Sequence, residues 1–475
     1  PIPDPRSPIP DPRSPIPDTC MASTASDQPR PAAAVAAPSP GLKARTLAGG
    51  GWITAEYTLG QALRFVGNLV LAYLLVPEAF GLMALVNVFV QGLQMFSDVG
   101  LAPSIIRSER GEDPRFLNTA WTIQIVRGVL LWLAACALAW PVALVWEYEL
   151  RYLLPVAAIT AVTMGMGSTS LYVLNRRLQM QAISKLRLTA QAVGVTVMVG
   201  WALVHPSVWA LVAGAIASEA TRSLGSYLLP TATRHRLAWD RAAVHELFRF
   251  GRWIFLGTLI TFLAKQSDKL LLGGLFSPGL LGVFWIAVQI SELAPLLVMR
   301  LGNTVGFPAM AELYRRDATQ FREKLTQVRL ALILPGNGGQ LLLLIAGPPI
   351  AVWLYPSAYG DVGWILRLMI IASLARVLTL TYLHAFLALG DSFRHMLCVA
   401  SRLVLTVGAA LAGYAMADRF GVTAELGFVA GLAVAPWLHY PIVAGLAASR
   451  GFWQPKLDLP ALAVCGGFSI VALLI

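Results

Sequence analysis

Charged residues are scarce in this sequence, and their scarcity sets the class of protein. Asp, Glu, Lys and Arg make up 13% of the 475 residues, whereas about a quarter of a soluble domain is charged. Hydrophobic residues reach 57% and form runs long enough to cross about 30 Å of hydrocarbon as helices of about 20 residues. This composition excludes a soluble globular fold. The runs predict an all-α polytopic membrane protein, because helices satisfy their own backbone in lipid.

Cysteine is also rare. The four cysteines, Cys20, Cys136, Cys398 and Cys465, show no CxxC spacing, and three of them lie in apolar segments. Small buried thiols are common at such positions. We therefore expect no disulfide, no metal site and no cofactor.

The amino-terminal segment lacks the apolar core of a cleavable signal peptide. Residues 22–50 are polar and rich in Ala and Pro, with no short apolar stretch ahead of a cleavage site. Before them, PIPDPRS occurs twice in tandem and is followed by PIPDTC and Met21. We expect residues 1–20 not to be native, Met21 to be the natural start, and residues 1–50 to form a disordered tail.

Polar breaks divide the rest of the chain into twelve or thirteen predicted spans. Lys and Arg gather at alternate junctions, for example Arg177 and Arg187 at the fourth, Arg329 at the eighth, and Arg394 and Arg402 at the tenth. Because retained cytoplasmic loops are enriched in these residues, we expect a cytoplasmic amino terminus. The predicted spans are 52–76, 80–100, 118–146, 152–174, 188–205, 208–228, 251–274, 280–299, 328–354, 362–389, 397–416, 425–448 and, as a thirteenth, 459–475.

Long outer loops are absent between these spans. A membrane sugar polymerase or ligase normally needs such a loop to carry its catalytic residues, so this alternative is disfavoured and we expect no enzyme. The formal net charge of +11 is explained by topology and by contact with anionic membrane lipids. We therefore predict no nucleic-acid partner, and the function must reside in the helix bundle.

A weak internal repeat relates the two halves of the chain. The segments VPEAFGLMALV and SPGLLGVFWIAV align Pro77 with Pro278 and Gly81 with Gly282, at an offset of 201 residues. Both halves would share one orientation and be related by an axis along the membrane normal, as in transporters built from parallel repeats. The predicted units are a first six-helix lobe at 51–228, a basic cytoplasmic linker at 229–250, a second six-helix lobe at 251–448, and a cytoplasmic loop with a truncated thirteenth helix at 449–475.

Glycine and proline interrupt two of the predicted spans. Gly165 and Gly167 loosen the fourth span, and Pro335 and Pro348 interrupt the ninth. Such residues allow membrane helices to bend where neighbours bond the freed backbone groups, although Gly is also common in tightly packed membrane helices. The segment GMGSTS is not a phosphate loop, because it lacks the lysine and the strand-turn-helix setting.

Several segments, in their order along the chain, resemble the polysaccharide-exporting branch of the MOP flippases. These Wzx-type transporters of lipid-linked oligosaccharides are relatives of MATE multidrug exporters and lipid II flippases, and the resemblance runs from about residue 45 to 450. It is carried by VPEAFGLMALVNVFVQGLQMFSDVGLAPSIIRSE, NTAWTIQIVRG, LNRRLQMQAISKLRLTAQAVG, PSVWALVAG and FGRWIFLGTLITFLAKQSDKLLLGGLFSPGLLGVF.

The resemblance implies a function as well as a MATE-like fold. It implies a multi-pass protein of the bacterial inner membrane that moves undecaprenyl-pyrophosphate-linked oligosaccharide across that membrane for exopolysaccharide or O-antigen assembly. Polysaccharide polymerase machinery is an expected partner. The alternatives are a cation-coupled MATE-like exporter of organic cations and a scaffolding or inactive member of the family.

Ionisable side chains inside the predicted spans are the candidate functional residues. Each costs a few kcal/mol at mid-bilayer, so each should face protein or water. Lys265, Asp268 and Lys269 share nearly one helical face, and the repeat places Arg64 over Lys265 and Asn68 over Lys269. One interpretation is an Asp–Lys pair that neutralises itself. The other is that the leftover positive charge, with Arg64 facing it across a cavity, binds an anion.

The resemblance suggests that this anion is the pyrophosphate of the lipid-linked sugar. Lys acts on phosphate as a point charge and Arg as a planar fork. Carboxylates in the spans could instead exchange a proton or hold Na⁺, although Asp268 could also simply hold the lysines in place. The predicted headgroup residues are Arg64, Lys265 and Lys269, with Arg127 and Arg376 as further candidates, and the predicted coupling residues are Glu56, Asp268 and Glu292.

Overall fold

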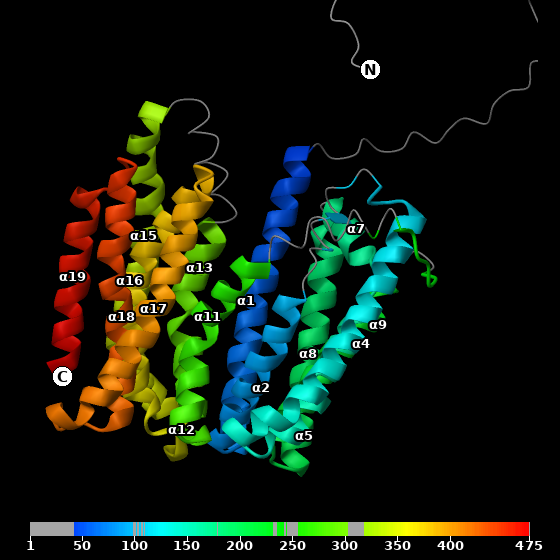
Figure 1. The fold of residues 1–475 in the computed structure, drawn as a ribbon, viewed down its shortest axis with the longest axis horizontal. Helices are drawn as coiled ribbons and strands as arrows, with labels where there is room; N and C mark the ends of the chain where they lie inside the picture. The colour runs from blue at the N-terminus through cyan, green and yellow to red at the C-terminus, as the bar shows by residue number, and fades with distance from the viewer. Residues whose placement is uncertain are drawn as a thin grey trace, which may run out of the picture.

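The computed structural model of this chain is a helical bundle. Figure 1 shows long helices lying side by side, with the first half of the chain on one side and the second half on the other. Every predicted span falls on one helix or on one broken helix, so the predicted all-α polytopic class is confirmed. The residues described are 42–97, 101, 104–105, 108, 110–177, 179–230, 235–241, 244, 255–302 and 318–474.

The helix bounds differ from the predicted spans mainly at their starts. The first helix begins at Leu42, inside the segment predicted as a tail, whereas residues 1–41, with Met21, lie outside the described residues. The first half comprises α1 (Leu42–Leu74), α2 (Pro77–Phe96), α4 (Pro114–Val145), α5 (Leu150–Ala157), α6 (Ile159–Gly165), α7 (Ser170–Arg176), α8 (Met180–Val204) and α9 (Val208–Ser226). The second half comprises α11 (Phe255–Leu275), α12 (Pro278–Ser291), α13 (Leu293–Leu301), α15 (Ala318–Leu354), α16 (Val362–Ala388), α17 (Ser392–Met416), α18 (Ala424–Ser449) and α19 (Pro455–Leu474), with short 3₁₀ turns at Ser357–Tyr359 and Ala417–Phe420.

Half of these helices are long and apolar enough to cross a membrane by themselves. Eight described helices meet that standard, or up to ten spans if each of two bent pairs counts as one. The bent pairs are Leu150–Gly165 with Ser170–Arg176, at 59°, and Pro278–Ser291 with Leu293–Arg300, at 45°. The predicted break at Gly165 is therefore present, whereas α15 runs as one helix through Pro335 and Pro348. The helices α1, α9 and α11 fall short of the standard, and each carries charged side chains within its length.

The loops at one end of the bundle are the basic ones, and ion pairs tie them to one another. Arg110 bonds Asp240 of the linker at 2.9 Å, and Arg450 bonds Asp391 at 2.7 Å. Arg177 lies 2.6 Å from Glu112, and its hydrogen bond lowers the pKa of that carboxyl. We call this the basic end, and it is the upper end in Figure 1.

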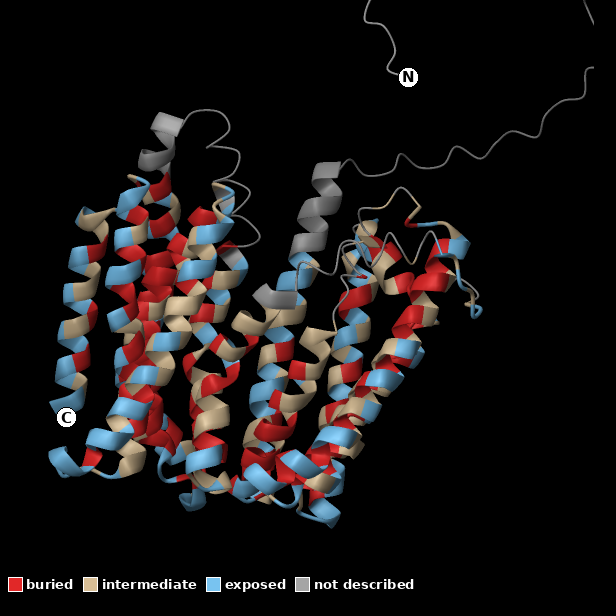
Figure 2. Ribbon diagram, in the orientation of Figure 1, coloured by how far each residue is buried: buried red, intermediate tan, exposed pale blue. Residues whose placement is uncertain are grey.

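At the opposite end, short connections from the two halves meet. The Tyr359 hydroxyl donates to the Leu75 carbonyl at 2.8 Å, and the Tyr73 hydroxyl donates to the Leu354 carbonyl at 2.9 Å. Buried side chains from both halves form one continuous core there, including Leu71, Phe80, Phe284 and Tyr359. Figure 2 shows buried residues gathered on the inner sides of the helices and exposed ones on their outward faces.

The repeat predicted from the sequence forms a close contact between the two halves. Pro77 and Pro278 are the first residues of α2 and α12, a position that suits proline because its missing N–H is not needed there. A Cβ added at Gly81 would lie 1.9 Å from the Pro278 carbonyl oxygen, and one at Gly282 would lie 1.9 Å from the Pro77 carbonyl oxygen. The equivalent residues therefore face each other reciprocally across an approximate two-fold axis.

A buried ion pair fastens α19 to the second half. The Arg329 guanidinium of α15 donates to Asp458 of α19 at 2.7 Å, and both side chains are 0% exposed. Arg329 also donates to Thr381 at 3.0 Å and to Gln454 at 3.1 Å, and the Tyr440 hydroxyl donates to Asp458 at 2.8 Å. The charges are thus compensated and hydrogen-bonded, as buried charges need to be.

Candidate functional site: a cationic cavity between the halves

A cavity of about 890 Å³ lies between the two halves of the bundle. Residues of α1, α2, α8 and α9 line it from the first half, and residues of α11, α12, α13, α16, α17 and α18 line it from the second. Toward the opposite end it stops on the buried side chains of Leu71, Phe80 and Phe284. Its lining reaches Glu56 and Arg187 toward the basic end, and the Arg187 side chain is 56% exposed.

Positive charge predominates in the lining of this cavity. Seven cationic side chains face three carboxylates, a formal excess of four positive charges. An excess of this sign in a partly closed space raises the local concentration of anions. The cationic residues are Arg64, Arg187, Arg222, Lys265, Lys269, Arg376 and Arg402, and the carboxylates are Glu56, Asp268 and Glu292.

Three of the arginines are held by carboxylates. Arg376 forms a close ion pair with Glu292. Arg187 lies 3.6 Å from Glu56, which also accepts a hydrogen bond from the Ser184 hydroxyl at 3.2 Å. Two of the three predicted coupling residues, Glu56 and Glu292, are therefore paired with arginines. Arg222 is 2.6 Å from Glu219, three residues before it on α9, so these two side chains neutralise each other.

The remaining four cations make no ion pair with any described residue. The Lys269 ammonium donates to Gln266 at 2.8 Å, and Arg402 donates to the Ala264 carbonyl at 2.8 Å. Asp268 accepts the backbone N–H of Lys269 at 2.9 Å, so its carboxylate is not in salt-bridge contact with either lysine. The uncompensated cations are Arg64, Lys265, Lys269 and Arg402.

Arg64 and Lys265 occupy equivalent positions in the two halves. Each lies ten residues before the last residue of its helix, Leu74 in α1 and Leu275 in α11. At 1.5 Å per residue, both stand about 15 Å from the ends of their helices. Both side chains are exposed to the cavity, so the repeat places two cations of the lining at one depth.

Arg402 and Arg187 were assigned to basic loops by the sequence argument, and both lie within helices. Asp391 caps α17 by accepting the Arg394 backbone N–H at 3.1 Å, so the helix begins at Ser392 and Arg402 lies ten residues inside it. Arg187 lies seven residues inside α8. The predicted spans began too late because charged residues in the first two or three turns of a helix look like loop residues. The Asp391 cap was the signal that could have placed Arg402 correctly.

Arg127 is not among the residues that line the cavity. Its side chain donates to the Ser97 hydroxyl at 2.9 Å and to the Gln94 carbonyl at 2.7 Å. It therefore ties α4 to the carboxyl end of α2, where helix carbonyls lack partners and a cation is favourable.

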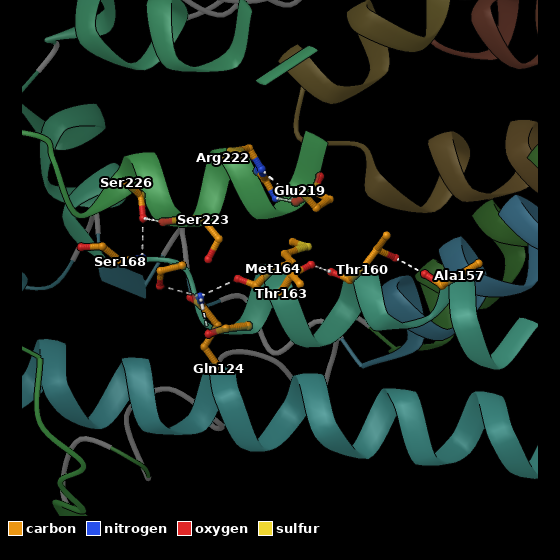
Figure 3. A network of polar contacts seen from close by, with 12 residues as sticks. Gln124, Ala157, Thr160, Thr163, Met164, Ser168, Glu219, Arg222, Ser223 and Ser226 are labelled. Carbon is orange, nitrogen blue, oxygen red and sulfur yellow. Dashed lines mark hydrogen bonds and ion pairs between the residues drawn. The ribbon is translucent and has the colours of Figure 1, made fainter. Parts of the chain in front are cut away.

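The broken helix of the first half lines one side of a smaller cavity of about 380 Å³, which shares Glu56, Arg187 and Arg222 with the central one. The Gln124 side-chain amide donates to the carbonyls of Met164, Gly165 and Gly167, each at 3.1 Å. The Ser168 backbone N–H donates to the Ser226 hydroxyl at 2.7 Å. Figure 3 shows this network, which joins α4, the break after α6, and α9. The backbone groups freed by the break are thus bonded, and the bend is fixed.

The part of the chain that the structure describes contains no group of three or more His, Cys, Asp or Glu side chains that could hold a metal ion. Cys136, Cys398 and Cys465 are free thiols there, whereas Cys20 lies outside the described residues.

Comparison with known proteins gives a consistent family. The sequence profile of the family described as "Polysaccharide biosynthesis protein" matches residues 70–335, more than half of the chain. The lipopolysaccharide biosynthesis protein WzxC of Escherichia coli (strain K12) is 22% identical over 451 residues, covering 90% of this chain and 89% of the relative. The succinoglycan biosynthesis transport protein ExoT of Rhizobium meliloti (strain 1021) is 23% identical over 288 residues, covering 60% of this chain and 58% of the relative.

Solved structures with the same fold are transporters. An inward-facing multidrug resistance MATE family transporter of the MOP superfamily superposes with a TM-score of 0.61 at 15% identity, covering 86% of this chain and 95% of the other. The lipid II flippase MurJ, in an inward closed conformation, superposes with a TM-score of 0.63 at 11% identity, covering 89% and 95%. These likenesses confirm the MATE-like fold.

Proposed function

This chain belongs to the polysaccharide biosynthesis protein family, and we propose that it moves lipid-linked oligosaccharide between the leaflets of the bacterial inner membrane. The chain is a multi-pass inner-membrane protein and a polysaccharide exporter of the MOP superfamily. Its relatives and structural neighbours are transporters rather than enzymes. The finer proposal is that its substrate is a repeat unit on undecaprenyl pyrophosphate.

The observation that carries this proposal is the set of four uncompensated cations in the central cavity. A pyrophosphate offers several anionic oxygens, which Arg can bind as a fork and Lys as a point charge. These oxygens would be bound jointly by Arg64 of the first half and by Lys265, Lys269 and Arg402 of the second. A cavity of about 890 Å³ lies in the range of small-molecule sites, about 300–1,000 Å³, and accommodates a headgroup while the prenyl tail remains in lipid.

The arrangement of the two ends supports a direction of transport. The basic end would be cytoplasmic, with the amino terminus, because Lys and Arg are retained on that side. The opposite end is closed by the contact between α2 and α12 and by the buried floor at Leu71, Phe80 and Phe284. Rocking of the halves about that contact would expose the cavity to the other side.

Arg376 and the carboxylates have supporting roles in this proposal. Arg376 is neutralised by Glu292, and Glu56 is shared by Arg187 and Ser184. Asp268 is the lining carboxylate without an ion pair among the described residues, and its carboxylate accepts the backbone N–H of Lys269 at 2.9 Å. We propose that Asp268 positions the cations. Exchange of H⁺ or Na⁺ at Asp268, and contact with polysaccharide polymerase machinery, stay predictions.

The rival transporter function is export of organic cations, as the likeness to a MATE multidrug transporter suggests. The net positive charge of the lining opposes it, because that charge repels a cationic substrate. The net charge is still three when Glu219 is counted against Arg222. Glu56 and Glu292 are already bound by arginines. The anion-binding function is therefore the better supported one.

The test is complementation of a deletion strain. Arg64→Ala, Arg402→Ala and the pair Lys265→Ala with Lys269→Ala should each reduce surface polysaccharide and accumulate the lipid-linked repeat unit in the cytoplasmic leaflet. Loss of one charged hydrogen bond, worth about 1.5–3 kcal/mol, predicts about a 10- to 150-fold loss of binding.

Arg419→Ala is the matched control, because Arg419 is exposed at the opposite end in the turn Ala417–Phe420. Membrane levels of all variants should match the wild type. Unchanged polysaccharide in the deletion strain would refute the function, and full complementation by every cavity variant would refute the cationic site.

A further inference from the structure

Three amide side chains in the central cavity have no partner among the described residues. Asn68 of α1, Asn87 of α2 and Gln289 of α12 line the cavity and make no hydrogen bond with any residue the structure describes. Other amides of the same lining are occupied. Gln266 donates to Gln91 at 3.1 Å.

Free amides at these positions call for an explanation. Asn is a poor helix former, because its side chain competes for backbone hydrogen bonds. An unpaired amide away from water also loses a few kcal/mol of solvation. All three side chains are half-buried within the bundle. Neutral amides add nothing to the charge that attracts pyrophosphate, so the anion site does not account for them.

Two of the amides lie in the same cavity as the cations and at about the same depth along their helices. Asn87 lies ten residues after the first residue of α2, and Gln289 lies eleven residues after that of α12. Both are about 15 Å above the closed end, at 1.5 Å per residue, which is also the depth of Arg64 and Lys265. A ligand held at the cations therefore presents its adjoining atoms to these amides.

Nearer the closed end, the lining continues with groups that suit a sugar ring. Asn68 lies six residues before the end of α1, and Trp285 lies seven residues after the start of α12, both about 10 Å from the closed end. The Trp285 ring lines the cavity and stacks on Phe80 with 6.0 Å between centroids. Its indole combines a large apolar face with one N–H donor. Beyond it lies only the buried floor.

We propose that Asn68, Asn87, Gln289 and Trp285 form a sugar subsite that binds the glycan next to the pyrophosphate, with the glycan directed toward the closed end. This inference rests on the proposed function, since it assigns a binding site to the glycan of that substrate, which the cations do not contact. Each amide both donates and accepts, which matches hydroxyl groups that do the same. A site built to bond hydroxyls discriminates strongly against a ligand that lacks them.

The test compares two lipids on the purified full-length chain in nanodiscs. One is the lipid-linked repeat unit extracted from cells that lack this chain, and the other is undecaprenyl pyrophosphate without a glycan. The variant Asn87→Leu with Gln289→Met replaces both amides by apolar groups of similar shape. Gln179→Met, an exposed position outside the cavity, is the matched control, and Asn68→Leu serves if the double variant does not fold.

The wild type should bind the glycosylated lipid more tightly than the glycan-free lipid. The double variant should keep its affinity for the glycan-free lipid and lose about 25-fold of the affinity for the glycosylated one, at about fivefold per hydrogen bond. Equal binding of both lipids by the wild type, or an undiminished preference in the variant, would overturn the subsite and leave the flippase proposal intact. Equal loss of both lipids in the variant would assign the amides to the pyrophosphate instead. Failure of the wild type to bind either lipid would overturn both proposals.

Discussion

The contact between α2 and α12 predicts that one methyl group can open the closed end. Gly81→Ala places a Cβ 1.9 Å from the Pro278 carbonyl oxygen, whereas ordinary contact begins at 3.4 Å. The helices must therefore part by about 1.5 Å, because the obstacle is backbone and cannot rotate away. Overpacking of this kind costs about 1–3 kcal/mol, which shifts a two-state equilibrium about 5- to 150-fold. Gly282→Ala should also separate the two helices, since its added Cβ would lie 1.9 Å from the Pro77 carbonyl oxygen.

The assay is labelling of a cavity cysteine from the periplasmic side. Met83→Cys, in a background with the native cysteines replaced by Ser, places a thiol in the lining close to the closed end. A membrane-impermeant maleimide should label it at least fivefold faster when Gly81→Ala is added. Gly200→Ala is the control, because nothing lies within 4 Å of its new Cβ. Equal labelling rates in the Gly81→Ala and Gly200→Ala proteins would refute the idea that this contact closes the cavity.

Two further predictions concern parts of the fold that hold the cavity in shape. Arg329→Met should lower the stability of the detergent-solubilised protein by about 3–5 kcal/mol, because it strands a buried carboxylate at Asp458. Adding Asp458→Leu should recover much of that loss in a thermal unfolding assay, and a double variant no more stable than the single one would contradict this account. Gln124→Leu should lower the free energy of unfolding by about 1–3 kcal/mol, because three carbonyls at the break lose their hydrogen-bond donor. If Gln124→Leu unfolded at the same temperature as the wild type in this assay, Gln124 would not have this role.

The membrane spans and the repeat could be predicted from the sequence, because both depend on local patterns of residues. Polar breaks separate apolar runs whatever the tertiary packing, so every predicted span coincides with a helix or a broken helix. The alignment of Gly81 with Gly282 rests on spacing alone, and the structure adds that these residues pack against each other's helices. The same spacing predicts that Arg64 and Lys265 are equivalent, and each lies ten residues before the end of its helix.

Pairing between distant residues could not be predicted in this way. Arg376 and Glu292 are far apart in the sequence, and only the packing of α16 against α12 and α13 brings them together. Arg127 was a further headgroup candidate because it is an arginine within a span, yet it bonds the end of α2. The face of a helix that lines the cavity depends on the rotation of the helix about its own axis. The sequence does not predict this rotation where apolar residues occur on every face of the helix.

Misplaced helix starts account for the other differences. Arg329 was counted as a loop residue, although it lies eleven residues inside α15 and is fully buried. Its partner Asp458 lies in the first turn of α19. A charged residue near a predicted helix end can belong to a loop, to a helix cap or to a buried ion pair. The position of its counterion in the fold distinguishes these three cases.

The central claim is that uncompensated cations in the cavity carry a pyrophosphate-linked glycan across the membrane. The direct measurement is the rate at which the extracted lipid-linked repeat unit changes leaflets in proteoliposomes containing the wild type, Arg419→Ala, or Arg64→Ala with Lys265→Ala. The account predicts rapid movement with the first two proteins and a rate close to that of protein-free vesicles with the double variant. Movement by the double variant at the wild-type rate, or no movement by the wild type, would contradict it.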